Sequence, residues 1–484
     1  MPVIEEGETA WRIARADRMA VISDAAAYFV AVSEAVLKAR HSVFMLGWDF
    51  DTRINMCPEG DGEDAPYELG GFLKHVVKIN KGLNIYILRW DLAILKMPFR
   101  GRMPLMLIDW ITSRRLHFRL DGQHPPAACH HQKIVVVDDV IAFCGGIDLT
   151  SDRWDTSEHR DEHPKRVRPS GSPYPPWHDA TTVLEGEAAR SLGELARRRW
   201  ALVTNEILPP ANRSGSAPWP QSIVPDFERV DVGIARTDPG TNRDLPVREI
   251  EKLYLRAIAS AKNSIYMETQ YFACSRIAKA LGEALEREDG PEVVLINPES
   301  SQGWLEEAAM GSARAILLRE LAQRDRWGRF RCFWPATAGG NPIYVHAKIL
   351  VIDDTLLRVG SSNVNNRSMG MDTECDVAVE ASTLKERRQI QDVRDRFLAE
   401  HLGVEVTEVS AAMDSGINIV KTIEKLSKAS GRRLIPLDAG EVTETERDIF
   451  ESKLLDPSTP EQMSNAFKRG RWPLPALVKK MIGV

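Results

Sequence analysis

Residues 130–139, HHQKIVVVDD, have a near copy at residues 344–354, YVHAKILVIDD, and this repeat decides how the chain folds. Both copies follow the pattern H-x-K-x4-D. The apolar, β-branched run after each lysine ends in paired acids, which predicts a buried strand closed by a turn. Side chains alternate along a strand, so the histidine and the lysine of each copy point to the same side. Two matching sites in one chain indicate one paired active centre.

A small-residue turn follows each copy, CGGID at 144–148 and VGSSN at 359–363. The first glycines of the two turns align, and Asp148 aligns with Asn363. Glycine lets the backbone approach a ligand closely, and a polar side chain at the end of the turn can hydrogen-bond that ligand. Each half is therefore expected to offer a histidine, a lysine and a polar side chain.

The repeat extends beyond the motif to neighbouring segments. SVFMLGWDF at 42–50 resembles SIYMETQYF at 264–272, and DATTVLEG at 179–186 resembles ECDVAVEA, which follows the second motif. Strand-like and helix-like segments alternate in both copies. This pattern predicts an α/β fold of two similar α-β-α sandwich lobes with mixed sheets, a pseudo-dimer with its active site at the lobe interface.

The chain divides into four expected parts. The first lobe covers residues 1–207, a linker rich in Pro, Gly, Ser and Asn covers 208–246, the second lobe covers 247–402, and a helical C-terminal extension of unassigned role covers 403–484. Residues 151–177 are predicted to form a long loop beside the site. Helices are expected at 24–40, 187–203, 248–262, 276–288, 304–323, 384–401, 416–430 and 441–455.

Composition restricts the class of protein. The chain has 484 residues, 43% of them hydrophobic and 27% charged, as in ordinary globular proteins. Its formal charge of −6 gives no global basic field, so we expect no nucleic-acid partner. The N-terminus does not resemble a secretory signal, and no apolar run is long enough to span a membrane. We therefore expect a cytoplasmic protein with, at most, peripheral membrane contact.

The duplicated histidine and lysine supply the groups that phosphodiester cleavage requires, so no metal or other cofactor is expected. One of His131 and His346 would attack phosphorus, while the other protonates the leaving alcohol and then activates water or an acceptor alcohol. The expected intermediate is a phosphohistidine. The six cysteines do not follow metal-ligand spacings and are interpreted as reduced structural thiols.

Several polar side chains should support the two histidines. The substrate phosphate would be bound by Lys133, Lys348, Asp148 and Asn363. Each histidine also needs a carboxylate that fixes its tautomer, and the candidates are Glu374 and Asp179. The aspartates inside the motifs lie beyond the strands and are expected to hold structure: Asp138 and Asp353.

These features together resemble the phospholipase D superfamily, whose signature is a duplicated H-x-K-x4-D motif at the interface of two α/β lobes. The resemblance covers roughly residues 20–400. The stretches that are similar to eukaryotic-type phospholipases D are GGIDLTSDRWDTSEHR at 145–160, PPWHD at 175–179, YMETQYF at 266–272 and IYVHAKILVIDDTLLRVGSSNVNNRSM at 343–369.

The resemblance implies a catalytic pair, usually with His131 as the nucleophile and His346 as acid and base. It also implies a crossed arrangement, in which Glu374 orients His131 and Asp179 orients His346. The implied reaction is hydrolysis of the distal phosphodiester of a glycerophospholipid, giving phosphatidic acid and a headgroup alcohol, with transfer to other alcohols as a second outcome. Transient contact with a membrane surface follows from that substrate.

Three alternatives stay open. The same chemistry would serve a cardiolipin-synthase-like phosphatidyltransferase, or a phosphodiesterase acting on nucleic acid, which the net negative charge disfavours. A scaffold protein with a decayed site is the third, although both motifs are complete. Aromatic residues could form the mouth of a lipid site or pack in the core; these are Trp48, Phe99, Trp154, Trp177 and Trp304.

Overall fold

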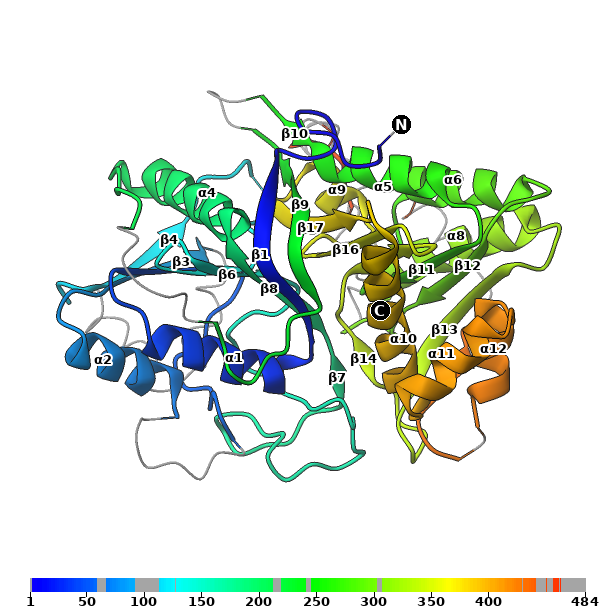
Figure 1. The fold of residues 1–484 in the computed structure, drawn as a ribbon, viewed down its shortest axis with the longest axis horizontal. Helices are drawn as coiled ribbons and strands as arrows, with labels where there is room; N and C mark the ends of the chain where they lie inside the picture. Colours follow the sequence, from blue (N-terminus) through cyan, green and yellow to red (C-terminus); the bar gives the residue numbers. More distant parts are fainter. Residues whose placement is uncertain are drawn as a thin grey trace, which may run out of the picture.

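A mixed sheet runs through the whole molecule, with helices on both of its faces (Figure 1). The structure is a computed structural model, and it describes residues 2–58, 67–91, 113–126, 128–211, 219–240, 245–302, 307–428, 430–440, 450, 456–460 and 462. None of the described helices combines the length and the apolar character that are needed to cross a bilayer.

The first half contributes eight strands and three helices within its described residues. The strands are β1 (Arg12–Ser23), β2 (Ser42–Gly47), β3 (Asn84–Trp90), β4 (Leu116–Asp121), β5 (Ile134–Val137), β6 (Ile141–Gly145), β7 (Trp177–His178) and β8 (Ala180–Gly186). The helices are α1 (Ala25–Leu37), α2 (Leu69–Ile79) and α4 (Glu187–Thr204).

The second half repeats this plan. Its strands are β9 (Phe227–Asp238), β10 (Val247–Arg248), β11 (Ser264–Glu268), β12 (Glu292–Ile296), β13 (Phe330–Ala336), β14 (Tyr344–Val345), β15 (Ile349–Ile352), β16 (Leu356–Gly360), β17 (Glu374–Glu380) and β18 (Arg433–Pro436). Its helices are α5 (Glu249–Ser260), α6 (Ser275–Glu286), α8 (Ser312–Arg324), α9 (Asn366–Gly370), α10 (Leu384–Leu402), α11 (Val406–Asp414) and α12 (Ile419–Leu426), and a π-helical turn at Glu307–Gly311 leads into α8.

The strand order is the same in both halves when it is followed outward from the centre. The sequence β1-β8-β6-β5-β2-β3-β4 matches β9-β17-β16-β15-β11-β12-β13, and β1 pairs with β9 in an antiparallel register. In each half the last three strands are parallel and the others antiparallel. The predicted α/β class with a mixed sheet is confirmed, and the repeated order is consistent with two similar lobes.

The expected linker at 208–246 needs correction, because it contains β9, a central strand of the sheet. Proline, glycine and serine in the flanking residues dominate the composition of this stretch, whereas β9 itself places Phe227, Val230, Val232 and Ile234 in the core. The strand pattern inside the stretch is therefore short but clear. The connection between the halves leads directly into the strand that joins their sheets.

The C-terminal extension, expected to be helical, also contributes a strand. β18 pairs with β13 and extends the edge of the sheet, while α11 and α12 pack beside α10. The predicted helix at 416–430 corresponds to α12, and most of the one predicted at 441–455 lies outside the described residues. The start of the helix predicted at 304–323 also lies outside them.

Three large apolar clusters of the described residues fill the space between the sheet and its helices. One contains residues of α1 and α2 in the first half, and another contains residues of α5, α6 and α8 in the second half. The third lies on the opposite face and includes residues of α4, α10, α11 and α12 from both halves. Because this last cluster is shared, the two halves bury apolar surface together.

The motif aspartates hold equivalent turns in the two halves. The carboxylate of Asp138 accepts hydrogen bonds from the backbone N–H groups of Arg40, His41 and Ser42, at 2.7–2.8 Å. The carboxylate of Asp353 accepts three in the same way, from Lys262, Asn263 and Ser264, at 2.7–3.0 Å. Each aspartate thus ties the turn after a motif strand to the start of β2 or β11. This geometry matches the structural role expected for both.

Replacing Asp353 with alanine should lower the free energy of unfolding by about 2–4 kcal/mol, because three backbone N–H groups, of which that of Ser264 is buried, lose a charged acceptor. Alanine also disfavours the left-handed backbone of this residue, whose φ is 51°. Asp353→Asn keeps one acceptor oxygen and tolerates that backbone, so its loss should be smaller. Urea unfolding measures both. A stable Asp353→Ala protein that had lost its activity would contradict the structural role.

Candidate functional site

The two H-x-K motifs lie just before β5 and β15. The strands begin at Ile134 and Ile349, one residue after each lysine, so the histidines and lysines stand at the strand entrances and not within the strands as expected. Each lysine turns back on its own motif: Lys133 Nζ donates to the carbonyl oxygen of His131 at 3.0 Å, and Lys348 Nζ donates to that of His346. The cation is thereby fixed beside the histidine in both halves.

Each motif histidine is bonded to a carboxylate from the other half. His131 Nδ1 lies 2.9 Å from Glu374 Oε2, and His346 Nδ1 lies 2.7 Å from Asp179 Oδ2. All four side chains are largely or fully buried. The structure therefore brings these four sequence-predicted residues together in the crossed arrangement that the resemblance implied.

Backbone hydrogen bonds enforce the crossing. The N–H of His131 donates to the carbonyl oxygen of Thr373 at 2.9 Å, and the N–H of His346 donates to that of His178 at 2.7 Å. Thr373 and His178 each precede the acid that binds the histidine. The short strands β7 and β14, which meet at the boundary between the halves, continue the second of these contacts. Side-chain geometry thus follows from main-chain pairing.

Glu374 accepts hydrogen bonds from three side chains. Ser361 Oγ donates to Oε2 at 2.5 Å and Ser368 Oγ donates to Oε1 at 2.6 Å, in addition to the His131 imidazole. Burial raises the pKa of Glu374 to about 7, against these donors and the charge of Lys133. Burial, followed by the charges of Lys133 and Lys348, lowers the pKa of His131 well below its ordinary value. The pair therefore holds a neutral imidazole near neutral pH.

The second pair is polarised differently. Burial alone would raise the pKa of Asp179, but the His346 imidazole, Lys348 and the backbone N–H of Ala180 hold it below its ordinary value. Burial, and then the charge of Lys348, lowers the pKa of His346 well below its ordinary value. Asp179 thus stays ionised and fixes the Nδ1–H tautomer of His346, leaving Nε2 for chemistry.

The two lysines have unequal partners. Lys133 Nζ lies 3.3 Å from Asp148 Oδ2, and the other oxygen of Asp148 accepts from the N–H of Trp48 at 3.0 Å. This geometry favours orientation of Lys133 over contact between Asp148 and phosphate. Among the described residues, Lys348 Nζ donates hydrogen bonds to neutral oxygens, those of the His346 carbonyl and, at 3.5 Å, of Gln270 Oε1, and burial lowers its pKa to about 7.

Asn363 is the residue of the second half that aligns with Asp148. Its side chain is buried, and its Oδ1 has no hydrogen-bond partner within the described part of the chain. A buried unpaired polar group is costly unless a ligand binds to it. The neighbouring glycines, in contrast, do not leave space for a ligand: a Cβ at Gly145 would overlap Thr181 of β8, and one at Gly360 would overlap Asp376 of β17. These glycines permit close packing of strands, which corrects the expectation.

Sequence reasoning missed the two serines that bind Glu374 and the amide of Gln270. Ser361 lies in the small-residue turn after the second motif, where its size alone was noted, and Ser368 lies in the stretch NNRSM. A carboxylate expected to orient a histidine needs further donors when it is buried, which is the signal that could have found the serines.

The aromatic residues are mostly packed. Trp177 is 3% exposed and contacts Tyr344, with ring centroids 4.7 Å apart, while the Arg153 guanidinium lies 4.3 Å from its ring. Its faces are therefore occupied by the protein, contrary to a free aromatic face for a quaternary ammonium. Trp154 lies in the core, and Trp48 stacks on Trp90. Phe99 and Trp304 lie outside the described residues.

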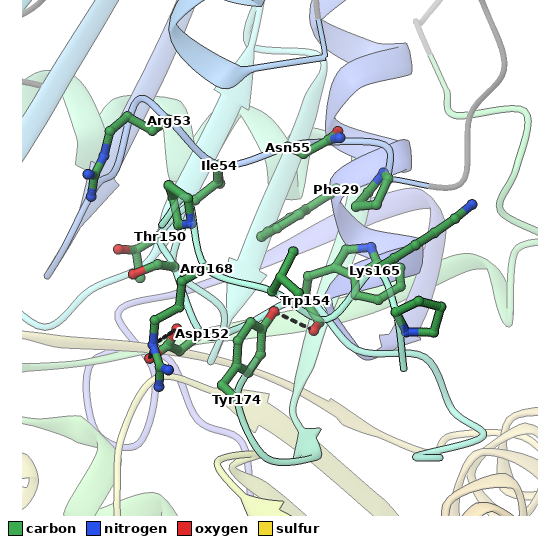
Figure 2. A pocket seen from close by; sticks show the side chains of 15 residues that line it. Phe29, Arg53, Ile54, Asn55, Thr150, Asp152, Trp154, Lys165, Arg168 and Tyr174 are labelled. Carbon is green, nitrogen blue, oxygen red and sulfur yellow. Dashed lines mark hydrogen bonds and ion pairs between the residues drawn. The ribbon is translucent and has the colours of Figure 1, made fainter. Parts of the chain in front are cut away.

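The long loop at 151–177 does border open space (Figure 2). A pocket of about 320 Å³ lies between this loop and the segment after β2, and a second of about 250 Å³ lies where the loop meets the second half. Arg168 and Tyr174 line both pockets, and Arg168 is paired with Asp152 at 3.0 Å. Neither pocket is lined by a motif histidine.

The repeated α/β halves with a crossed histidine–carboxylate site define a class of two-lobed proteins with a duplicated H-x-K motif. Two family models match this chain, one described as phospholipase D over residues 121–211 and one described as cardiolipin synthase, PLD-like domain, over residues 254–398. The chain belongs to the phospholipase D superfamily.

Known relatives are more distant than these motifs suggest. The chain is 24% identical to phospholipase D A of Dictyostelium discoideum over 463 residues, which cover 78% of this chain and 35% of the relative. It is 25% identical to phospholipase D alpha 2 of Oryza sativa subsp. japonica over 524 residues, covering 77% and 63%. The chain thus spans between about one third and two thirds of these relatives.

A solved structure shares the fold. Phosphatidylserine synthase of Haemophilus influenzae Rd KW20 superposes with a TM-score of 0.54 at 12% identity, over 86% of this chain and 94% of the synthase. At this identity the similarity supports the architecture alone.

The crossed pairs should be energetically coupled. In a double-mutant cycle of Asp179→Asn and His346→Gln, each single change leaves a buried partner unpaired. We therefore expect the sum of the two single-mutant losses in unfolding free energy to exceed the loss in the double mutant by about 1–3 kcal/mol. Because the folded pKa of Asp179 is depressed, the coupling should be present above its ordinary pKa of 3.8 and be lost as the pH falls through the lower folded value. Urea unfolding at pH 7 measures the coupling, only a partial decrease is expected at pH 3, and strict additivity at pH 7 would contradict the pairing.

Proposed function

We propose that this protein is a phospholipase D that hydrolyses the distal phosphodiester of glycerophospholipids, giving phosphatidic acid and a headgroup alcohol. The observation that carries the proposal is the pair of crossed histidine–carboxylate contacts, each beside a buried lysine. Such a site offers a nucleophile, an acid and two cations for one phosphodiester. Membership of the superfamily, and relatives named phospholipase D, support the substrate class.

In the proposed mechanism, His131 Nε2 attacks phosphorus in line with the bond to the headgroup oxygen. The P–N bond forms as the P–O bond breaks, and His346 gives the departing oxygen its proton. His346 then takes a proton from water, whose oxygen attacks phosphorus and releases His131. Attack by an alcohol in place of water gives the transfer product.

The neutral state of His131 suits the first step of this mechanism, which also needs His346 in its protonated form. A neutral His131 has a lone pair on Nε2, and Glu374 stabilises the charge that the imidazole acquires on attack. Lys133 and Lys348, with Asn363, would bind the non-bridging oxygens. An anionic phosphodiester offsets the lysine charges that lower the pKa of His346, so substrate binding itself should favour the protonated acid.

The proposed partner is a phospholipid at a membrane surface, contacted transiently by a protein that otherwise resides in the cytoplasm. No nucleic-acid partner is proposed, because the formal charge of −6 opposes binding of a polyphosphate. A phosphatidyltransferase is the second candidate, and the family model described as cardiolipin synthase, PLD-like domain, favours it over residues 254–398. The two differ in the acceptor, water or a lipid alcohol.

A substrate whose leaving group needs no proton should distinguish the nucleophilic role of His131 from the acid role of His346. With phosphatidyl-p-nitrophenol, in which p-nitrophenol takes the place of the headgroup, His346→Gln should release a burst of about one p-nitrophenol per enzyme and then stall, whereas His131→Gln should show no burst. Stopped-flow absorbance measures the burst, and acid-labile phosphate on the stalled protein identifies the phosphohistidine. A burst from His131→Gln, with none from His346→Gln, would reverse the roles.

The pKa of Lys348 predicts an alkaline limit to activity. Lys348 must be charged to bind phosphate, and its pKa of about 7 in the free protein means that this charge is lost as the pH rises. We therefore expect kcat/KM to fall about tenfold per pH unit above pH 7. Lys348→Arg keeps its charge, so a lower but flatter profile is expected above pH 7. Identical profiles for the two proteins would rule out Lys348 as the titrating group.

A lipid panel distinguishes hydrolysis from transfer. Vesicles of phosphatidylcholine, phosphatidylethanolamine or phosphatidylglycerol should yield phosphatidic acid, and added ethanol should yield phosphatidylethanol, with both products reduced at least about 10³-fold in His131→Gln. Formation of cardiolipin from phosphatidylglycerol, without phosphatidic acid, would instead support the transferase.

A further inference from the structure

Behind the paired site lies a second cluster of chemistry-bearing side chains that the proposed function does not use. It consists of Asp24, His159, His178 and Glu400, and is called here the interlobe cluster. One nitrogen or oxygen from each of the four lies within 4.8 Å of all the others, and all four side chains are buried. We propose that the interlobe cluster is a structural zinc site.

The two histidines are oriented as metal ligands are. His159 places Nδ1 3.0 Å from Asp155 Oδ2, and His178 places Nε2 2.8 Å from Glu268 Oε2. When each ring donates an N–H to its outer carboxylate, the remaining nitrogen carries a lone pair. Both lone pairs then face the centre of the cluster. A carboxylate behind each ligating histidine is the usual support of a zinc site.

Two of the atoms that face the centre, His178 Nδ1 and Asp24 Oδ2, have no hydrogen bond among the described residues. His178 Nδ1 lies 2.7 Å from Glu400 Oε1 and 3.3 Å from Asp24 Oδ1, yet within the described residues it has no hydrogen bond of acceptable direction. Asp24 Oδ2 is also without a hydrogen bond there. His159 Nε2, in contrast, forms a hydrogen bond of 3.2 Å with Glu400 Oε1 and lies 3.6 Å from Asp24 Oδ2. Buried nitrogen and oxygen atoms that lie this close without a directed hydrogen bond, as His178 Nδ1 and Asp24 Oδ2 do, are expected when they point at a common ion.

The ligand set selects the ion. The two imidazole nitrogens lie 2.7–3.6 Å from oxygens of Asp24 and Glu400, which suits four-coordinate Zn²⁺, whose bonds of about 2.0–2.2 Å place tetrahedral ligands roughly 3.3 Å apart. Calcium would require about 6–8 oxygen ligands. The charges of Asp24 and Glu400 balance a divalent ion with both histidines neutral.

The position of the cluster gives such an ion a mechanical role. Asp24 precedes α1, His159 lies in the long loop and His178 in β7, all in the first half, whereas Glu400 lies on α10 of the second half. The carbonyl oxygen of His178 accepts the N–H of His346, and the next residue, Asp179, binds the ring of His346. Zinc would therefore fix α10 against the segment that positions the second motif histidine. The inference does not depend on the substrate.

The site predicts zinc in the purified full-length chain. Protein expressed with added zinc and dialysed against metal-free buffer should hold about one zinc per chain by plasma mass spectrometry, as expected for a closed structural site. A strong chelator should lower the melting temperature, and zinc should restore it. Cobalt added to the metal-free protein should give the visible absorption of four-coordinate Co²⁺ at one equivalent. Zinc-free protein that shows no such absorption would overturn the proposal.

Matched variants locate the ion. His159→Gln and Glu400→Gln should each weaken zinc binding at least about tenfold. His130→Gln is the control, because His130 is equally buried but contacts Thr373 and Asp121 outside the interlobe cluster, so it should retain zinc. His131→Gln should also retain zinc. Loss of zinc in His131→Gln, or its retention in both ligand variants, would assign the ion to another place. If the ligand variants fail to fold, the cobalt spectrum of the unaltered chain still decides.

Discussion

The rest of the structure depends on the exchange of partners between the halves, in which each motif histidine is bonded to an acid that the other half supplies. Neither half holds a complete histidine–carboxylate pair, so the site exists only when the two are correctly registered. The antiparallel pairing of β1 with β9 and the shared apolar cluster provide that register. A continuous sheet is therefore a condition of the chemistry, since sliding the halves by one residue would separate both pairs.

Burial of the crossed pairs sets their electrostatics, and it does so unequally. Glu374 accepts from two serines and the His131 ring, yet burial still raises its pKa to about 7, whereas His346 and Lys348 keep the pKa of Asp179 below its ordinary value. An acid that readily takes up a proton can stabilise a histidine that becomes charged, and a permanently ionised acid fixes a tautomer. The same motif thus gives two environments suited to different steps.

Sequence reasoning reached the fold class, the motif pairs and both outer acids, because these depend on local patterns and on a repeat that can be aligned. It failed where a short strand pattern lies within a stretch of loop-like composition, or where the residues in contact are distant in the sequence. β9 was assigned to a linker because its flanks dominate the composition. The role of Gly360 is to admit Asp376 of a neighbouring strand, which spacing along the chain does not reveal. The interlobe cluster draws ligands from four separate segments, so no spacing motif marks it.

The residues that precede the two acids, His178 and Thr373, are equivalent in the repeat but differ in their side-chain contacts. His178 and Thr373 occupy matching positions before the two acids, and each gives its carbonyl oxygen to a motif histidine. Their side chains differ: Thr373 Oγ1 lies 2.9 Å from His130 Nδ1, while His178 faces Asp24 and Glu400. In the second half, one side-chain hydrogen bond and the backbone hydrogen bonds of Thr373 with Cys129 and His131 hold this position. The interlobe cluster, to which His178 belongs, therefore has a different role. Because the cluster includes Glu400 on α10, we infer that this role is to attach α10 to the first half.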